Sequence, residues 1–131
     1  MTVLEGEFAI TSWDETPYAE RDGDRKLTRA SVTQDVHGDI VGTGQVEWLM
    51  SYAADGTAHF VGLQQCEGTV GDRAGSVVFE TNGHFDGNEA TWTAKVVPGS
   101  GTGDWATMHG EGSFRAPHGN KASYTLDCSF D

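Results

Sequence analysis

The chain has 131 residues, which is enough for one domain with a single hydrophobic core. Its 20 acidic and 8 basic residues give a formal net charge of −12, which argues against nucleic acids and anionic membrane surfaces as partners. Eighteen Gly and only three Pro favour many short strands joined by tight turns over a bundle of helices.

The N-terminal residues do not show a basic segment followed by an apolar one, and no apolar run approaches the roughly 20 residues that cross a bilayer. We therefore expect a cytoplasmic protein that makes no contact with a membrane. In that compartment, Cys66 and Cys128 are expected to be free buried thiols rather than a disulfide.

Alternation of apolar and polar side chains predicts eight strands. The first, residues 4–13, is expected to end before Pro17, which cannot donate to a sheet ladder, and the charged residues 18–26 are expected to form an exposed loop. Tight turns separate the later strands, the last of them at residues 116–120, and a Gly-rich connection at 98–107 has room for one helical turn. These strands are expected at 27–36, 40–52, 58–68, 75–85, 89–97, 108–114 and 122–130.

The stretch from residue 46 to residue 52 predicts which face of the sheet is buried. Every second side chain in it is large and apolar: Val46, Trp48, Met50 and Tyr52. The residues between them are polar except for Leu49, so the face that carries Trp48 is expected to point inward. In the opposite orientation Glu47 and Glu80 would be interior acids, which is costly for unpaired carboxylates.

Eight strands joined by short turns predict an all-β fold, a closed antiparallel up-and-down barrel with little helix, because closure removes the exposed strand edges. A two-sheet sandwich is the alternative. The interior of an eight-stranded barrel is just wide enough to be filled by side chains or to hold one small ligand.

Neither a cofactor nor a metal is expected. The run from Gly99 to Gly103 lacks the Gly-Lys-Ser/Thr ending of a phosphate-binding loop. The five histidines have no spacing that would force three or four zinc ligands together.

Ordered motifs occur along most of the chain: TSWDETPY (11–18), KLTRASVT (26–33), VEWLMSY (46–52), FVGLQQ (60–65), VVPGSGTG (96–103), GEGSF (110–114) and APHGNKASYTLD (116–127). Together they resemble a family of small bacterial proteins of undefined activity. The segment from Val96 to Gly112 is similar to the Gly-Thr-Gly connection and following strand of dirigent proteins, so the family resembles the allene oxide cyclase and dirigent-protein barrels. The resemblance implies an antiparallel eight-stranded barrel, often oligomeric, with an apolar cavity, and no catalytic residue of those enzymes matches a position here.

The predicted lining of the barrel combines aromatic side chains with a few polar ones, which is typical of a small-molecule site. Ser12, Gln34, Thr81 and both thiols are expected on the same inward face. The alternative is that these side chains fill the barrel completely. Trp13 and Arg29 could line the mouth or pack at the rim, with Arg29 paired to a surface acid. The candidate ligand-binding residues are Trp48, Met50, Tyr52, Phe60, Gln64, Phe79, Trp92 and Tyr124.

We expect the barrel to bind a small apolar molecule, either as a cofactor-independent cyclase or isomerase or as a non-catalytic binding, storage or structural protein. Tyr52, Gln64 and Tyr124 are the candidate catalytic residues, because they could orient a carbonyl or hydroxyl group. A homo-oligomer is also expected, since a lone barrel rarely exposes an apolar patch of this kind. That patch consists of Leu49, Val61, Leu63 and Val78.

Overall fold

The computed structural model describes residues 2–117 and 122–130, and the described residues form nine strands. These strands are β1 (Thr2–Glu20), β2 (Lys26–Gly38), β3 (Val41–Tyr52), β4 (Ala58–Val70), β5 (Arg73–Phe85), β6 (Glu89–Val96), β7 (Thr102–Gly103), β8 (His109–Pro117) and β9 (Ala122–Ser129). The part of the predicted turn at residues 118–120 lies outside the described residues.

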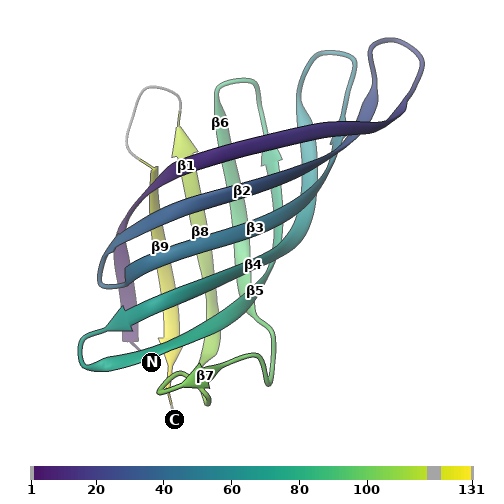
Figure 1. Cartoon of the computed structure of the whole chain (residues 1–131). Helices are drawn as coiled ribbons and strands as arrows, with labels where there is room; N and C mark the ends of the chain where they lie inside the picture. The colour runs from purple at the N-terminus through teal and green to yellow at the C-terminus, as the bar shows by residue number, and fades with distance from the viewer. Residues whose placement is uncertain (1, 118–121, 131) are drawn as a thin grey trace.

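The strands form one closed antiparallel barrel (Figure 1). Its order is β4-β3-β2-β1-β9-β8-β6-β5, and the pairing of β4 with β5 closes it. The two residues of β7 pair with β5 outside this circuit, so the barrel itself has eight strands. The predicted barrel is therefore confirmed, and the sandwich alternative is wrong. No helix in the described part of the chain is long and apolar enough to cross a membrane.

The orientation of β3 agrees with the prediction from residues 46–52. Trp48 is 2% exposed, whereas the neighbouring Leu49 is 50% exposed on the outer face. Glu47 also lies outside, where it accepts hydrogen bonds from Arg29 and Ser31, and Glu80 is exposed. The inverted orientation, with both acids in the interior, is therefore excluded.

The first strand differs from the prediction, because it continues through Pro17 to Glu20. Beyond Phe8 it pairs with β2 alone among the described residues, which leave its other edge without a neighbouring strand. A free edge tolerates proline, since no ladder hydrogen bond is lost there. The extra length of β1 and β2 carries their hairpin past the barrel, at the upper right of Figure 1.

The two ends of the barrel are built differently. The connection between β6 and β8 folds under the end where both termini lie (Figure 1), and Trp105 in this connection is completely buried. Its indole nitrogen donates to the backbone oxygen of Arg73 at 3.2 Å, and Gly75 lies against its ring. At the opposite end the described connections, residues 21–25, 53–57 and 86–88, are short loops, which leave room for a hollow.

Candidate functional site

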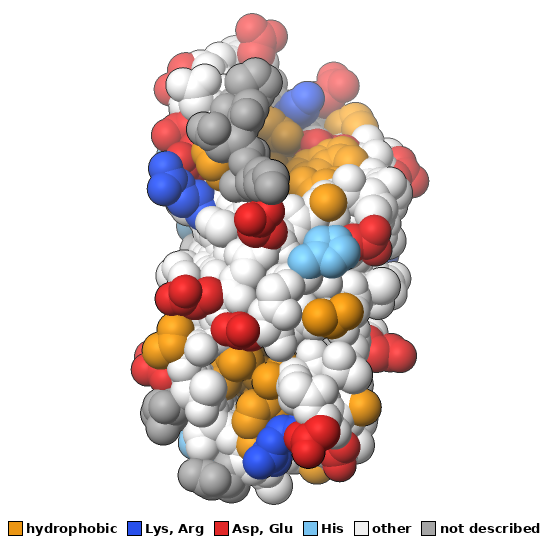
Figure 2. All heavy atoms as spheres, turned by 90° about the vertical axis from the view of Figure 1, so that its left-hand side faces the viewer, with side chains coloured by type: hydrophobic (Ala, Val, Ile, Leu, Met, Phe, Trp, Pro, Cys, Tyr) orange, Lys and Arg blue, Asp and Glu red, His pale blue; other side chains and the backbone are white. Residues whose placement is uncertain are grey.

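The open end of the barrel contains an apolar pocket of about 210 Å³. Figure 2 shows hydrophobic side chains gathered at this upper end, beside atoms that are not described. Five of the eight predicted ligand-binding residues line it, whereas Gln64, Phe79 and Tyr124 do not. The lining residues are Ile10, Trp13, Trp48, Met50, Tyr52, Phe60, Phe85, Ala90, Trp92 and Ala116.

The floor of this mouth pocket is a tightly packed group of aromatic rings. Trp48 lies 4.8 Å from Phe60 and 4.9 Å from Trp92, measured between ring centroids. The ring of Trp92 stacks on that of Phe114, with the two centroids 5.3 Å apart and an angle of 3° between the ring planes. Aromatic side chains thus pack in the middle of the barrel, and this hollow lies at its mouth.

One corner of the pocket is polar and is organised by Glu15. Its carboxylate accepts hydrogen bonds from Tyr52 Oη at 2.7 Å, Thr28 Oγ1 at 2.6 Å and Trp13 Nε1 at 2.9 Å. The ammonium group of Lys26 lies 4.9 Å from the centre of the Tyr52 ring. A negative charge is therefore held at the rim by three donors and a nearby cation.

These contacts shift the titration of both groups. Burial disfavours the charged form of Glu15, but the hydrogen bonds from Thr28, Tyr52 and Trp13 outweigh it and lower the pKa of the carboxyl group. Burial and the neighbouring carboxylate raise the pKa of Tyr52 well above its usual value. Tyr52 is therefore a neutral phenol whose proton is committed to Glu15 and whose oxygen still has acceptor capacity.

We predict that Glu15 makes the stability of the barrel depend on pH. Because its pKa is lower in the folded than in the unfolded chain, its contribution is complete above about pH 4.5 and is lost as the pH falls through the folded-state pKa. Charged hydrogen bonds of this kind contribute about 1 kcal/mol at a partly exposed site. Urea unfolding of the parent and of Glu15→Gln, followed from neutral to acid pH, should show a smaller acid loss in the variant. Parallel curves would contradict this assignment.

The other two candidate catalytic residues lie elsewhere in the barrel. Gln64 is buried in its centre, where it accepts a hydrogen bond from Trp92 and donates one to Gln34. The hydroxyl group of Tyr124 donates to the backbone oxygen of His37 at 2.7 Å and accepts from the backbone nitrogen of Ile40 at 3.0 Å. Ile40 precedes β3, at the opposite end of that strand from Tyr52, so the three candidates do not form one site.

The family model described as "Protein of unknown function (DUF3224)" matches residues 4–128. The chain belongs to this family. A solved structure of a DUF3224 protein of unknown function from Shewanella oneidensis MR-1 is similar to it, with a TM-score of 0.81 and 26% sequence identity. The similarity covers 100% of this chain and 98% of that one. No curated protein matches the sequence.

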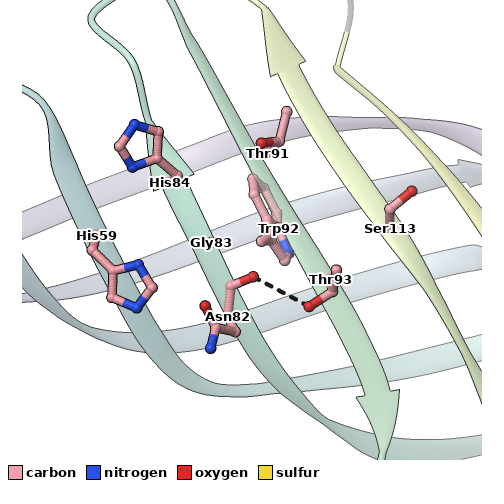
Figure 3. Close-up of a pocket in the computed structure, with 8 residues that line it drawn as sticks. All are labelled: His59, Asn82, Gly83, His84, Thr91, Trp92, Thr93 and Ser113. Carbon is pink, nitrogen blue, oxygen red and sulfur yellow. Dashed lines mark hydrogen bonds between the residues drawn. The ribbon is translucent and has the colours of Figure 1, made fainter.

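A second hollow of this DUF3224 barrel lies on its outer wall and has about 300 Å³ (Figure 3). His59 and His84 face each other there across β4 and β5, beside Asn82. The hollow is a shallow groove open to solvent. Among the described residues, no group of three or more His, Cys, Asp or Glu is placed to hold a metal ion. The mouth pocket is therefore the better candidate site.

Sequence reasoning missed Glu15 and misplaced Ser12. Register shifts in the pairing of β1 with β2, one of them between Ile10 and Ser12, change which side chains point inward. Ser12 is exposed and hydrogen-bonded to Thr33, whereas Trp13 lines the mouth pocket and Glu15 accepts hydrogen bonds from the lining residues Trp13 and Tyr52. The possibility that Trp13 lines the mouth is confirmed.

Both cysteines are free and buried, in agreement with the prediction. Burial raises the pKa of Cys66 to about 12 and, together with Asp127, that of Cys128 to about 11. Both thiols therefore stay neutral at physiological pH and are poor nucleophiles. Arg29 is bonded to Glu47 at 2.7 Å on the outer face, which is the surface pairing considered for it.

Proposed function

We propose that this DUF3224 barrel binds a small, largely apolar molecule in its mouth pocket. The observation that carries the proposal is an aromatic-walled hollow at one end of the barrel, above a group of packed rings. An apolar pocket with a few convergent polar groups is the usual form of a small-molecule site. Its 210 Å³ is less than the roughly 300–1,000 Å³ typical of such sites, so the ligand is small or extends out of the mouth.

The polar corner selects the kind of group that the ligand carries. Since the proton of Tyr52 is directed to Glu15, the tyrosine oxygen is left as an acceptor at the pocket wall. A ligand hydroxyl group can donate to it, while the hydrocarbon part contacts Trp48, Met50 and Phe60. We therefore infer a ligand with an aliphatic or aromatic body and a hydroxyl group, such as a medium-chain alcohol.

Binding should be tested first with 1-octanol and n-octane. Trp13, Trp48 and Trp92 line the pocket, so tryptophan fluorescence reports its occupation. We predict that Ala116→Phe, which fills the mouth, weakens binding of both probes at least about tenfold, or about 1.4 kcal/mol. Ala9→Phe, at an exposed position of β1 outside the lining, is the matched control and should bind like the parent.

The polar corner has its own test. Tyr52→Phe should abolish the preference for octanol over octane and leave octane binding unchanged. If neither probe binds the parent, or if Ala116→Phe binds as well as the parent, the mouth pocket is not the site.

We further propose that the mouth pocket converts its ligand. The sequence resembles the allene oxide cyclase group, and a pocket that confines a flexible ligand can favour ring closure or isomerisation by holding the reacting groups together. Tyr52 is then the residue that orients the ligand. The alternative is binding or storage without reaction. Chromatography of recovered ligands, which separates isomers of equal mass, decides between them: unchanged ligand supports storage, and conversion that Tyr52→Phe slows supports catalysis.

We also propose that the outer face of β3 and β4 pairs with a second copy of the chain. Leu49 and Val61 are direct cross-strand partners and are 50% and 41% exposed, and Leu63 nearby is 57% exposed. The Arg29–Glu47 ion pair borders this patch. In a two-fold interface each copy would present both charges to the other, so the patch is complementary to itself.

The dimer proposal predicts a measurable change in mass. Leu63→Lys should shift the protein from dimer to monomer in sedimentation velocity, because it places two like charges at the interface. Val41→Lys is the control, since Val41 is 56% exposed at the other end of β3. A parent protein that is monomeric at all concentrations would contradict the proposal.

A further inference from the structure

A directed chain of hydrogen bonds runs through the packed centre of the barrel. Trp92 Nε1 donates to Gln64 Oε1 at 3.2 Å, and Gln64 Nε2 donates to Gln34 Oε1 at 2.9 Å. The two glutamines are each 1% exposed, and Trp92 is 3% exposed. The chain connects β6, β4 and β2 across the interior.

The indole group fixes the direction of the whole chain. An indole N–H can only donate, so Gln64 must turn its oxygen toward Trp92 and its amide nitrogen toward Gln34. Gln34 must in turn present its oxygen to Gln64. Flipping either amide would place one N–H group against another, so the usual ambiguity of amide orientation does not arise here.

This direction leaves the amide nitrogen of Gln34 as an unused donor at the end of the hydrogen-bond chain. Among the described residues, Gln34 Nε2 has no hydrogen-bond partner. Buried amide groups are nearly always paired, and an unpaired one costs about 1–3 kcal/mol. Gly44 accommodates the amide, because a Cβ atom there would come within 2.5 Å of Gln34 Oε1.

We infer that Gln34 Nε2 binds a hydrogen-bond acceptor oxygen supplied from outside the chain. The oxygen belongs either to one enclosed water molecule or to the carbonyl group of a ligand. Trp92 links the two regions, since its ring lines the mouth pocket and its N–H begins the chain that ends at Gln34. The ligand source rests on the proposed function, whereas the water source does not.

NMR spectroscopy of the full-length ¹⁵N-labelled protein tests the inference. The side-chain amide signals of Gln34 are identified by their loss in Gln34→Met or, should that variant not fold, by their NOEs to Gly44 and Gln64. An enclosed water gives NOE cross-peaks between these amide protons and a long-lived water. A ligand carbonyl instead shifts the Gln34 signals when 2-octanone is added and not when n-octane is added. The Gln64 amide is the internal control, because its nitrogen already donates a hydrogen bond to Gln34. Its signals should show weaker water cross-peaks and smaller shifts than those of Gln34.

The possible results separate this inference from the proposed function. If octane and octanone bind the mouth pocket but Gln34 shows neither a water cross-peak nor a carbonyl-dependent shift, the inference fails and the proposed function stands. If a long-lived water is found at Gln34 and no probe binds, the inference stands and the proposed function fails. Absence of both effects in a protein that binds nothing overturns both.

Discussion

Replacing Trp92 with alanine should destabilise the barrel by about 3–5 kcal/mol, because large core aromatic residues leave a cavity when they are truncated. The Trp92 indole is 3% exposed and lies among four rings. Their centroids are 4.9 Å (Trp48), 5.3 Å (Phe114), 5.6 Å (Phe8) and 6.0 Å (Phe60) from that of Trp92. Hydrogen-bonded ladders hold β6 on both sides, so the backbone cannot move in to fill the space. The substitution also removes the donor to Gln64. Equilibrium urea unfolding followed by far-UV circular dichroism measures the loss.

Trp13→Ala is the control for this experiment. Trp13 is also a pocket residue, with its ring 5.8 Å from Trp48, but it is 44% exposed at the mouth. Its truncation removes less buried surface and one hydrogen bond to Glu15, so we expect a loss of about 1–2 kcal/mol. Equal losses in the two variants would mean that the central ring group is not the main source of stability.

The strands with plain alternation could be predicted from the sequence. Residues 46–52 place one large apolar side chain at every second position, and this period of two is what a half-buried strand requires. For β4 the pattern was mixed, because Val61 and Leu63 are apolar on the outer face and Gly62 and Gln64 are not apolar on the inner one. Its face becomes clear only from its neighbours, where Gly62 pairs with Trp48.

The first strand shows where alternation fails. The register shift between Ile10 and Ser12 reverses the parity of the residues up to Pro17, where a second shift follows. The prediction therefore put Ser12 inside in place of Trp13 and Glu15. Bulges have no reliable sequence signal, since any residue type can occupy the extra position. This error concealed Glu15, which organises the polar corner of the pocket.

The candidate site was predicted in composition but not in position. Tyr52, Gln64 and Tyr124 all point inward, yet they lie at different levels of the barrel. A shared face says nothing about height along the axis, which depends on strand tilt and register. For the same reason the sequence left open whether the interior is full or hollow, and the structure combines a packed centre with a hollow mouth.

Gly62→Ala should cost about 3 kcal/mol, at the upper end of the usual range for overpacking. A Cβ atom at Gly62 would overlap the backbone oxygen of Glu47 on β3 and lie 2.8 Å from Trp48 Cδ1. The strands would have to separate, which would disturb the hydrogen bonds of Thr81 Oγ1 to Gly62 O at 2.9 Å and from Trp48 Nε1 at 3.1 Å. Urea unfolding gives the cost, and a changed near-UV circular dichroism spectrum would report movement of Trp48.

The matched control for this substitution is Gly87→Ala, which separates the steric cost from the backbone cost. Gly87 has a φ of +100° in a turn, and nothing lies within 4 Å of a Cβ atom built there. Alanine at that position should lose about 1–2 kcal/mol of stability, and only because its backbone must stay left-handed. Because Trp48 forms the floor of the mouth pocket, Gly62→Ala should also weaken octane binding, whereas Gly87→Ala should not. A Gly62→Ala variant no less stable than Gly87→Ala would contradict the expected steric cost, and would mean that the close approach of β3 and β4 does not fix the pocket floor.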